Sequence, residues 1–264
     1  LVGKFFGPLM FLWFSVLGAL GAMYVVQDLS IFKAFNPYYG IKLIVSNPNA
    51  LLILGGVFLC TTGAEALYSD LGHCGRKNIR VSWIFVKTML ILNYLGQGVY
   101  LLQNSSNYNN SINPFYEIVP DGYILYMVGL ATLAAAIASQ AMITGSFTLI
   151  SEAVRLNLWP KVKINYPSDQ KGQIYVPSIN WILWMGCILI VVGFNGSSDR
   201  MEGAYGLAIN ATFIATTILV AIFMLRKKVP LHWIIIFVSV FGLIEISFLI
   251  ANLQKFLHGG FVTV

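Results

Sequence analysis

The chain has 264 residues, of which 58% are hydrophobic and only 10% are charged, and its mean hydropathy is +0.77. Soluble domains carry about 25% charged residues, so a soluble protein of this composition would lack polar side chains to cover its surface. The composition excludes an ordinary soluble globular protein and predicts an all-α, polytopic membrane protein.

Apolar runs of membrane-spanning length, on the order of 20 residues, recur seven times along the chain. The predicted spans are 5–25, 50–69, 82–102, 123–150, 176–194, 204–225 and 231–252. The connections are short and rich in Pro, Gly, Asn and Ser, which leaves no room for a large soluble domain between spans. We therefore expect a single transmembrane domain over 1–264. The first residues lack a starting Met, a charged leader and a small-residue cleavage site, so we expect the chain to begin partway through a larger protein.

The basic residues gather on alternate loops, which predicts an orientation for the seven spans. One set of loops carries Lys4, Arg76, Lys77, Arg80, Arg155, Lys161, Lys163, Lys171, Arg226, Lys227 and Lys228, whereas the other carries Lys33, Lys42, Arg200 and Lys255. Because loops rich in Lys and Arg stay in the cytoplasm, we expect the first span to start inside and the last to end outside. The net charge of +6 follows from this asymmetry and does not indicate a nucleic-acid partner.

The second predicted span is interrupted by polar residues in the stretch CTTGAE, which contains Thr61, Thr62, Gly63 and Glu65. Hydroxyls, a carboxylate and backbone carbonyls freed where a helix unwinds at Gly63 are hard oxygen donors, which can replace the water shell of an alkali cation. Unwound helices of this kind bind ions and substrates in secondary transporters. The pattern predicts an ion or proton site; the alternative is a Glu65 that only hydrogen-bonds to a neighbouring helix.

The third and fourth predicted spans carry further polar residues. In the third span, Asn93 and Gln97 are four residues apart, and Gly96 and Gly98 beside them allow close packing, so interhelical hydrogen bonding is the favoured interpretation. In the fourth, Ser139 and Thr144 lie in a stretch rich in Ser, Thr and Gly, which fits either close packing or a lined cavity. Glu152 ends that span three residues before Arg155, which indicates an ion pair at the cytoplasmic end.

The last two predicted spans contain two other polar features. Tyr205 lies in the stretch AYGLAINAT, at the start of the sixth span. Glu245 lies deep in the seventh span and has no cationic neighbour in sequence. Its role as a hydrogen-bonding partner or as part of a proton relay stays open at this point.

No catalytic or metal-ligating constellation is visible in the sequence. The three histidines (His73, His232 and His258) are scattered, and the three cysteines have no zinc-like spacing. Phosphate-binding, nucleophile-elbow and zinc-protease motifs are missing from the sequence. We therefore expect no enzyme activity and no cofactor.

The stretch TTGAEALYSDLGHCG closely resembles the signature of the KUP/HAK/KT potassium transporters, T-G-A-E-A-L-Y-A-D-[ML]-G-H-F-G. The resemblance extends over nearly the whole chain, through FGPLMFLWF, NPYYGI, IASQAMITGSFTLISEAVRL, GQIYVPSINW, AYGLAINAT and ANLQKFLHGG. The departures are small: Ser69 and Cys74 stand where Ala and Phe are usual, and Lys77 stands where Arg is common.

This resemblance implies an amino acid–polyamine–cation (LeuT-like) fold with two inverted repeats, of which the seven spans here correspond to helices five to eleven. It implies that the second span is a broken helix. By motif match, it implies potassium ligands at Thr62 and Glu65 and, through A-Y-G, at Tyr205. Other ligands are expected from helix one, which is outside the chain.

We therefore expect part of a potassium uptake protein of the plasma membrane, in bacteria the inner membrane, that carries a proton together with potassium. Glu65 is the candidate for proton coupling, and Thr61, Gly63, Ser139 and Thr144 are candidates to line the site. The expected partners are potassium, a proton, the lipid bilayer and a second copy in a homodimer. The alternatives are a related transporter of an amino acid or polyamine and, from another class, a membrane enzyme or a structural membrane subunit.

Overall fold

A computed structural model describes residues 3–60, 62–63, 76–105, 113–166 and 174–253. The chain divides into two compact units. One unit comprises Leu1–Tyr39 with Ala66–Asn180, and the other comprises Gly40–Glu65 with Trp181–Val264. Apart from one isolated antiparallel bridge between Asn165 and Tyr175, the regular structure of the described residues is helical, which confirms the all-helical expectation.

The first unit is built mainly from three long helices, α1 (Gly3–Val25), α5 (Arg76–Gln103) and α7 (Ile124–Arg155), with short helices and turns between them. The short helices are the 3-10 helix η1 (Leu29–Phe35) and α6 (Pro114–Glu117). Two further helices cross the boundary between the units, α2 (Pro37–Ser46) and α8 (Pro177–Gly193).

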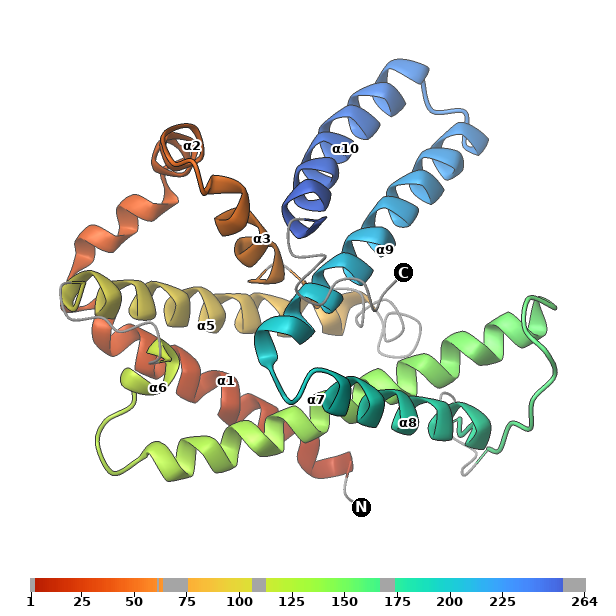
Figure 1. Ribbon diagram of the computed structural model, residues 1–264, viewed down its shortest axis with the longest axis horizontal. Helices are drawn as coiled ribbons and strands as arrows, with labels where there is room; N and C mark the ends of the chain where they lie inside the picture. Colours follow the sequence, from red (N-terminus) through yellow and green to blue (C-terminus); the bar gives the residue numbers. More distant parts are fainter. Residues whose placement is uncertain (1–2, 61, 64–75, 106–112, 167–173, 254–264) are drawn as a thin grey trace. The chain divides into compact units, whose positions relative to one another are not determined.

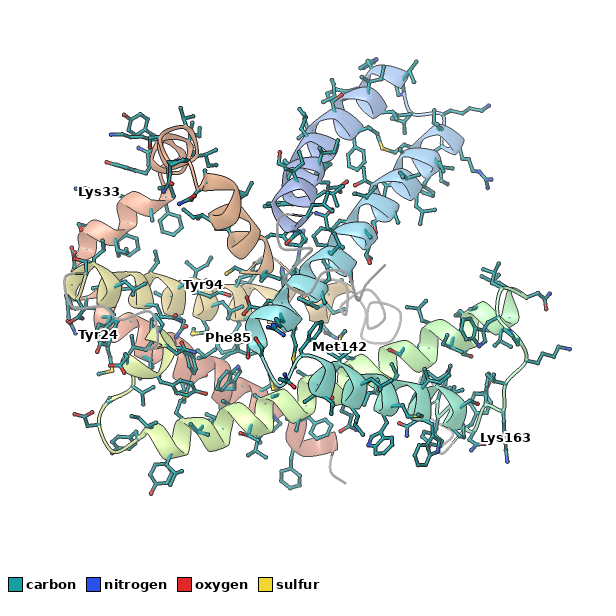
Figure 2. The ribbon with its side chains drawn as sticks, in the orientation of Figure 1. Tyr24, Lys33, Phe85, Tyr94, Met142 and Lys163 are labelled. Carbon is teal, nitrogen blue, oxygen red and sulfur yellow. The ribbon has the colours of Figure 1, made fainter. Side chains whose placement is uncertain are left out.

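Helices α1 and α5 form the most extensive helix contact of the first unit and run in the same direction. Phe11 stacks on Phe85 with ring centroids 4.9 Å apart, and further along the pair Tyr24 meets Tyr100 edge-on at 6.1 Å. Figure 2 labels Tyr24 and Phe85, one residue from each contact, at separate points along this pair. Consecutive spans cross a membrane in opposite directions, so the first and third spans should share a direction. Helices α1 and α5 contain these two predicted spans, and their shared direction agrees with this expectation.

The two backbones of this pair touch where both helices carry glycine. A Cβ added to Gly21 would lie 2.2 Å from the Leu92 carbonyl oxygen, and one added to Gly96 would lie 2.6 Å from the Gly21 Cα. Asn93, which is buried, donates from Nδ2 to the Leu17 carbonyl oxygen at 3.1 Å and accepts from Gln97 Nε2 at 2.6 Å. The predicted interhelical hydrogen bonding is therefore confirmed for Asn93.

The start of α7 packs against α1 in the hydrophobic core of this unit. The buried members of that core are Leu17, Leu20, Ile118, Val119 and Met127. At the other end of α7, Arg155 donates from a guanidinium nitrogen to Glu152 Oε1 at 2.9 Å, as the sequence predicts.

The second unit is built from α3 (Ala50–Cys60), α9 (Ser198–Arg226) and α10 (Leu231–Leu253). Helices α9 and α10 lie side by side and antiparallel (Figure 1). Asn210 on α9 donates to the Glu245 carbonyl on α10. One turn before Asn210 on α9, Gly206 faces Asn252, which comes nearly two turns after Glu245 on α10, so the two helices run in opposite directions. The opposite directions are those expected for the sixth and seventh predicted spans.

Among the described residues, five helices are long and apolar enough to cross a membrane: Phe5–Val25, Lys77–Gln103, Ile124–Arg155, Arg200–Arg226 and Leu231–Leu253. They correspond to the first, third, fourth, sixth and seventh predicted spans. In the place of the fifth span, α8 is a shorter apolar helix of 17 residues. In the place of the second, α3 has only 11 residues, and the rest of 50–69 lies largely outside the described residues. The chain is thus a helical, polytopic membrane protein, while the count of seven spans, their orientation and the single-domain organisation stay predictions.

Candidate functional site at the end of α3

Helix α3 ends at Cys60, within the predicted second span. The Leu59 carbonyl oxygen, which would accept from residue 63 in a continuing helix, instead accepts from the Thr62 backbone N–H at 3.3 Å and from the Thr62 hydroxyl at 2.7 Å. Gly63 has a φ of +103°, a left-handed conformation that glycine adopts without the steric strain of a side chain. The helical hydrogen-bond pattern is therefore lost at Thr62 and Gly63, where the sequence predicts a break. The continuation of the segment lies outside the described residues.

Helix α9 brings a second hydroxyl to this point. The Tyr205 Oη lies 3.5 Å from the Thr62 Oγ1, a long hydrogen bond in which the tyrosine hydroxyl donates. Thr62 in turn donates to the Leu59 carbonyl, so three oxygens follow one another: the Tyr205 hydroxyl, the Thr62 hydroxyl and the Leu59 carbonyl. Tyr205 is 44% exposed, so its side chain is not enclosed by the described residues.

This oxygen set can bind a hard cation. Hydroxyl and carbonyl oxygens are the ligands that alkali cations exchange for water in selective membrane sites. Softer metals prefer thiolate or imidazole ligands. Within the part of the chain that the structure describes, no three His, Cys, Asp or Glu side chains gather into a metal-binding group. The chemistry of the three oxygens thus fits an alkali ion better than a transition metal.

The structure brings together two of the predicted site residues, Thr62 and Tyr205, which are 143 positions apart in the sequence. Thr61 and Glu65 lie outside the described residues, so their predicted roles stay predictions. Ser139 and Thr144 are exposed on α7, in the other unit, where the Thr144 hydroxyl donates to the Gln140 carbonyl of its own helix at 2.9 Å. Their predicted role in lining the site also stays a prediction.

Two features of the second unit were not expected from the sequence. The Leu59 carbonyl was not singled out, although a threonine three residues later is a recurrent local hydrogen-bond donor to such a carbonyl. The second is the partner of Glu245: the carboxylate Oε1 accepts from the Thr217 hydroxyl at 2.6 Å, with both residues buried between α9 and α10. A pairing between two helices carries no signal in local sequence.

Comparison with known proteins identifies the family. The model of the "K+ potassium transporter integral membrane domain" matches residues 1–264, the whole chain. The chain belongs to this family. Its membership confirms the resemblance seen in the TGAEALYSDLGHCG stretch, the integral-membrane location and the assignment to transporters rather than enzymes.

Curated relatives are similar over the full length of the chain. It is 55% identical to a protein of Cytophaga hutchinsonii, 56% to one of Flavobacterium psychrophilum and 51% to one of Enterococcus faecalis, each named "Probable potassium transport system protein Kup". Each match covers 100% of this chain but only 40–41% of the relative, so the chain spans about two fifths of their length. No solved structure matches the chain.

Proposed function

We propose that the chain is part of a transporter that takes up potassium across the plasma membrane, in bacteria the inner membrane. The observation that carries the proposal is the meeting of the Thr62 and Tyr205 hydroxyls, 3.5 Å apart, where the hydrogen-bond pattern of α3 has stopped. Membership of the potassium transporter family favours potassium over an amino acid or polyamine as the substrate.

In this proposal, Thr62 and Tyr205 contribute neutral oxygen ligands to potassium. Glu65, three residues after Thr62, adds an anionic oxygen that offsets the loss of water from the ion. Protonation neutralises that carboxylate, and in this proposal the proton taken up at Glu65 is the one carried together with potassium. Thr61, Gly63, Ser139 and Thr144 line the path, and the remaining ligands come from helices outside the chain.

The same proposal includes an inverted-repeat fold in which the segment after Cys60 is the unwound part of a broken helix. The shortness of α3, with 11 residues, and the positive φ of Gly63 support it. Transporters with inverted repeats place their ion sites at such interruptions near the middle of the membrane. We also expect a homodimer, which the mass of the purified full-length protein in detergent tests.

The decisive experiment measures rubidium uptake by the full-length protein at several external pH values. Glu65→Gln keeps the shape of the side chain but cannot titrate, so we expect uptake to be strongly reduced and its pH dependence to flatten. Thr62→Val and Tyr205→Phe should raise the KM for rubidium and leave the pH profile unchanged.

Thr212→Val is the matched control, because this exposed hydroxyl on α9 donates only to the Ala208 carbonyl of its own helix, at 3.1 Å. It should transport as the unmodified protein does. Normal uptake by Glu65→Gln with an unchanged pH profile would remove Glu65 from the coupling step. An unchanged KM in both Thr62→Val and Tyr205→Phe would remove the proposed ligands.

A further inference from the structure

Helix α10 lies between the two helices that carry the candidate ligands. It packs along both α3 and α9, whereas α3 and α9 contact each other over a much shorter stretch. Phe58 of α3 is fully buried, with its ring 4.8 Å from that of Phe248 on α10 and 5.6 Å from that of Phe213 on α9. The separation of Thr62 from Tyr205 therefore depends on how α10 holds each of the two helices.

Helix α3 packs on α10 through small residues. A Cβ added to Gly55 would lie 3.6 Å from the Ala251 carbonyl oxygen and 3.7 Å from the Ala251 Cβ, an ordinary van der Waals contact. Ala251 is fully buried. The α3 glycine therefore faces a small buried side chain of α10, and this contact, with the Phe58–Phe248 ring contact, places α3 on α10.

The contact of α10 with α9 is fixed by buried polar groups. Glu245 is 8% exposed, and its Oε1 accepts from the Thr217 hydroxyl at 2.6 Å. The Glu245 backbone carbonyl also accepts from the fully buried Asn210 Nδ2, at 3.3 Å. Both bonds cross from one helix to the other, so Glu245 meets α9 at two points about two turns apart.

Two bonds to one residue define the register of the two helices. Sliding α10 by one turn would move it about 5.4 Å along α9 and leave the Glu245 carboxylate and the Thr217 hydroxyl buried without each other. A displaced apolar side chain meets other apolar neighbours in the new register, whereas a displaced buried polar group loses its hydrogen bond. The polar pair thus specifies one register.

We infer that Glu245, acting through Thr217, is a positioning residue that holds α9 against α10 so that the Tyr205 hydroxyl meets Thr62. Its effect reaches the site along α9, since Tyr205 lies twelve residues, or about 18 Å, from Thr217 on the same rigid helix. The inference rests on the proposed function, in that Thr62 and Tyr205 are taken to bind the transported ion.

The test compares rubidium uptake by variants of the full-length protein. Glu245→Leu and Thr217→Val should each raise KM about fivefold to tenfold, with Vmax per folded protein within about twofold of the unmodified value. Glu245→Gln should have the KM of the unmodified protein, because its amide oxygen still accepts from the Thr217 hydroxyl. Thr217→Ser should also have the unmodified KM, because its hydroxyl still donates to Glu245. The pH profile should be unchanged in all four.

Thr216→Val is the matched control, since this neighbouring hydroxyl is exposed and donates to the Thr212 carbonyl of its own helix, at 2.8 Å. The double variant Glu245→Leu with Thr217→Val separates positioning from folding. Removing both partners of a buried hydrogen bond costs little stability, so its melting temperature should return toward the unmodified value. KM should stay raised, because only the Asn210 bond to the backbone carbonyl of residue 245 then remains to define the register. Recovery of KM together with stability would overturn the inference.

A cross-linking measurement tests positioning without transport. Cysteines are introduced by Thr62→Cys and Tyr205→Cys in a full-length protein whose other cysteines are replaced by serine, and they are joined by a short bismaleimide. Glu245→Leu should lower the rate of cross-linking severalfold, and Glu245→Gln should not. If the unmodified protein takes up no rubidium while the cysteine variants show this cross-linking pattern, the proposed function is refuted and the positioning role stands. Equal cross-linking in all backgrounds, or loss of pH dependence in Glu245→Gln, would refute the positioning role.

Discussion

The α1–α5 pair and the α9–α10 pair are both built from long apolar helices, yet different atoms hold the helices together. In the α1–α5 pair the backbones touch, with Gly96 directly against Gly21. In the α9–α10 pair the closest approach at Gly206 is to the side-chain amide of Asn252, and the Thr217 hydroxyl bonds to Glu245.

The difference shows two ways in which helices associate in lipid. Lipid tails are as apolar as the side chains, so the hydrophobic effect does not drive helices together there, and small residues or buried polar groups must do so. Contact between backbones gives close packing that leaves no room for a side chain. Contact between polar side chains gives a defined register, but the side chains can still rotate. The first pair should therefore be the more sensitive to added volume.

The largest effect is expected from Gly21→Ala. The added Cβ would lie 2.2–2.5 Å from backbone atoms of Leu92 and Asn93, which cannot rotate away, so α1 and α5 must separate. We expect a loss of about 3 kcal/mol of stability, measured by thermal unfolding of the full-length protein in detergent. Gly129→Ala on α7 is the control, because nothing lies within 4 Å of its added Cβ. Equal melting temperatures for the two variants would contradict the backbone contact.

A smaller effect is expected from Asn93→Leu in the same pair. The substitution removes the bond to the Leu17 carbonyl and leaves the Gln97 amide without this acceptor. Interhelical hydrogen bonds in membranes contribute about 1 kcal/mol, so a loss of that size is expected in denaturant unfolding. Thr88→Val removes a hydrogen bond to the Ile84 carbonyl within α5, and we expect it to lower the stability clearly less than Asn93→Leu does. An unchanged free energy of unfolding in Asn93→Leu would mean that the Asn93 hydrogen bond does not stabilise the α1–α5 contact.

The comparison between the pairs is sharpest for Gly206→Ala and Gly96→Ala, because both added Cβ atoms meet their nearest atom at 2.6 Å. At Gly96 that atom is backbone, the Cα of Gly21; at Gly206 it is the end of the Asn252 side chain, which can rotate. We therefore expect Gly206→Ala to cost about 1 kcal/mol, less than Gly96→Ala.

Asn252→Ser should relieve most of the cost of Gly206→Ala, since the shorter side chain no longer reaches the added Cβ. The same thermal unfolding measurement checks both. A cost for Gly206→Ala that equals that of Gly96→Ala, and that persists with Asn252→Ser, would show that the α9–α10 pair is also held at the backbone.

The smallest effect is expected outside both pairs, at Asp28, which caps η1 and accepts from the Ser30 backbone N–H at 2.8 Å. Hydrogen bonds from the Ser30 side chain and backbone, with a smaller contribution from Lys33, lower the pKa of Asp28 below its usual 3.8. A lowered pKa stabilises the folded chain above the unfolded pKa, and this contribution is lost as the pH falls through the folded pKa.

The stability difference between the unmodified protein and Asp28→Ala should therefore be constant at neutral pH and shrink below about pH 4. Denaturant unfolding over a series of pH values measures it. Ser30→Ala should reduce the difference. A difference that stays the same down to the lowest pH would mean that the charge of Asp28 has no part in the cap.

The sequence by itself determined the class of the protein, most of its helices and its family. Hydropathy is a local property, so within the described residues five of the seven predicted spans correspond to helices long enough to cross a membrane. The interruption at Thr62 and Gly63 was also predictable, because a hydroxyl beside a glycine in an apolar run favours the end of a helix. The family motif lies within one continuous stretch and needs no knowledge of the fold.

Only the tertiary structure decided which distant residues meet. The Tyr205 hydroxyl lies beside Thr62, 143 positions away, and Glu245 pairs with Thr217 on the neighbouring helix. Hydropathy and local spacing place each residue on its own helix, but the path of the chain determines which faces of two helices come together. Family resemblance pointed to Tyr205, whereas Glu245 acquired a partner only when α9 and α10 were packed against each other.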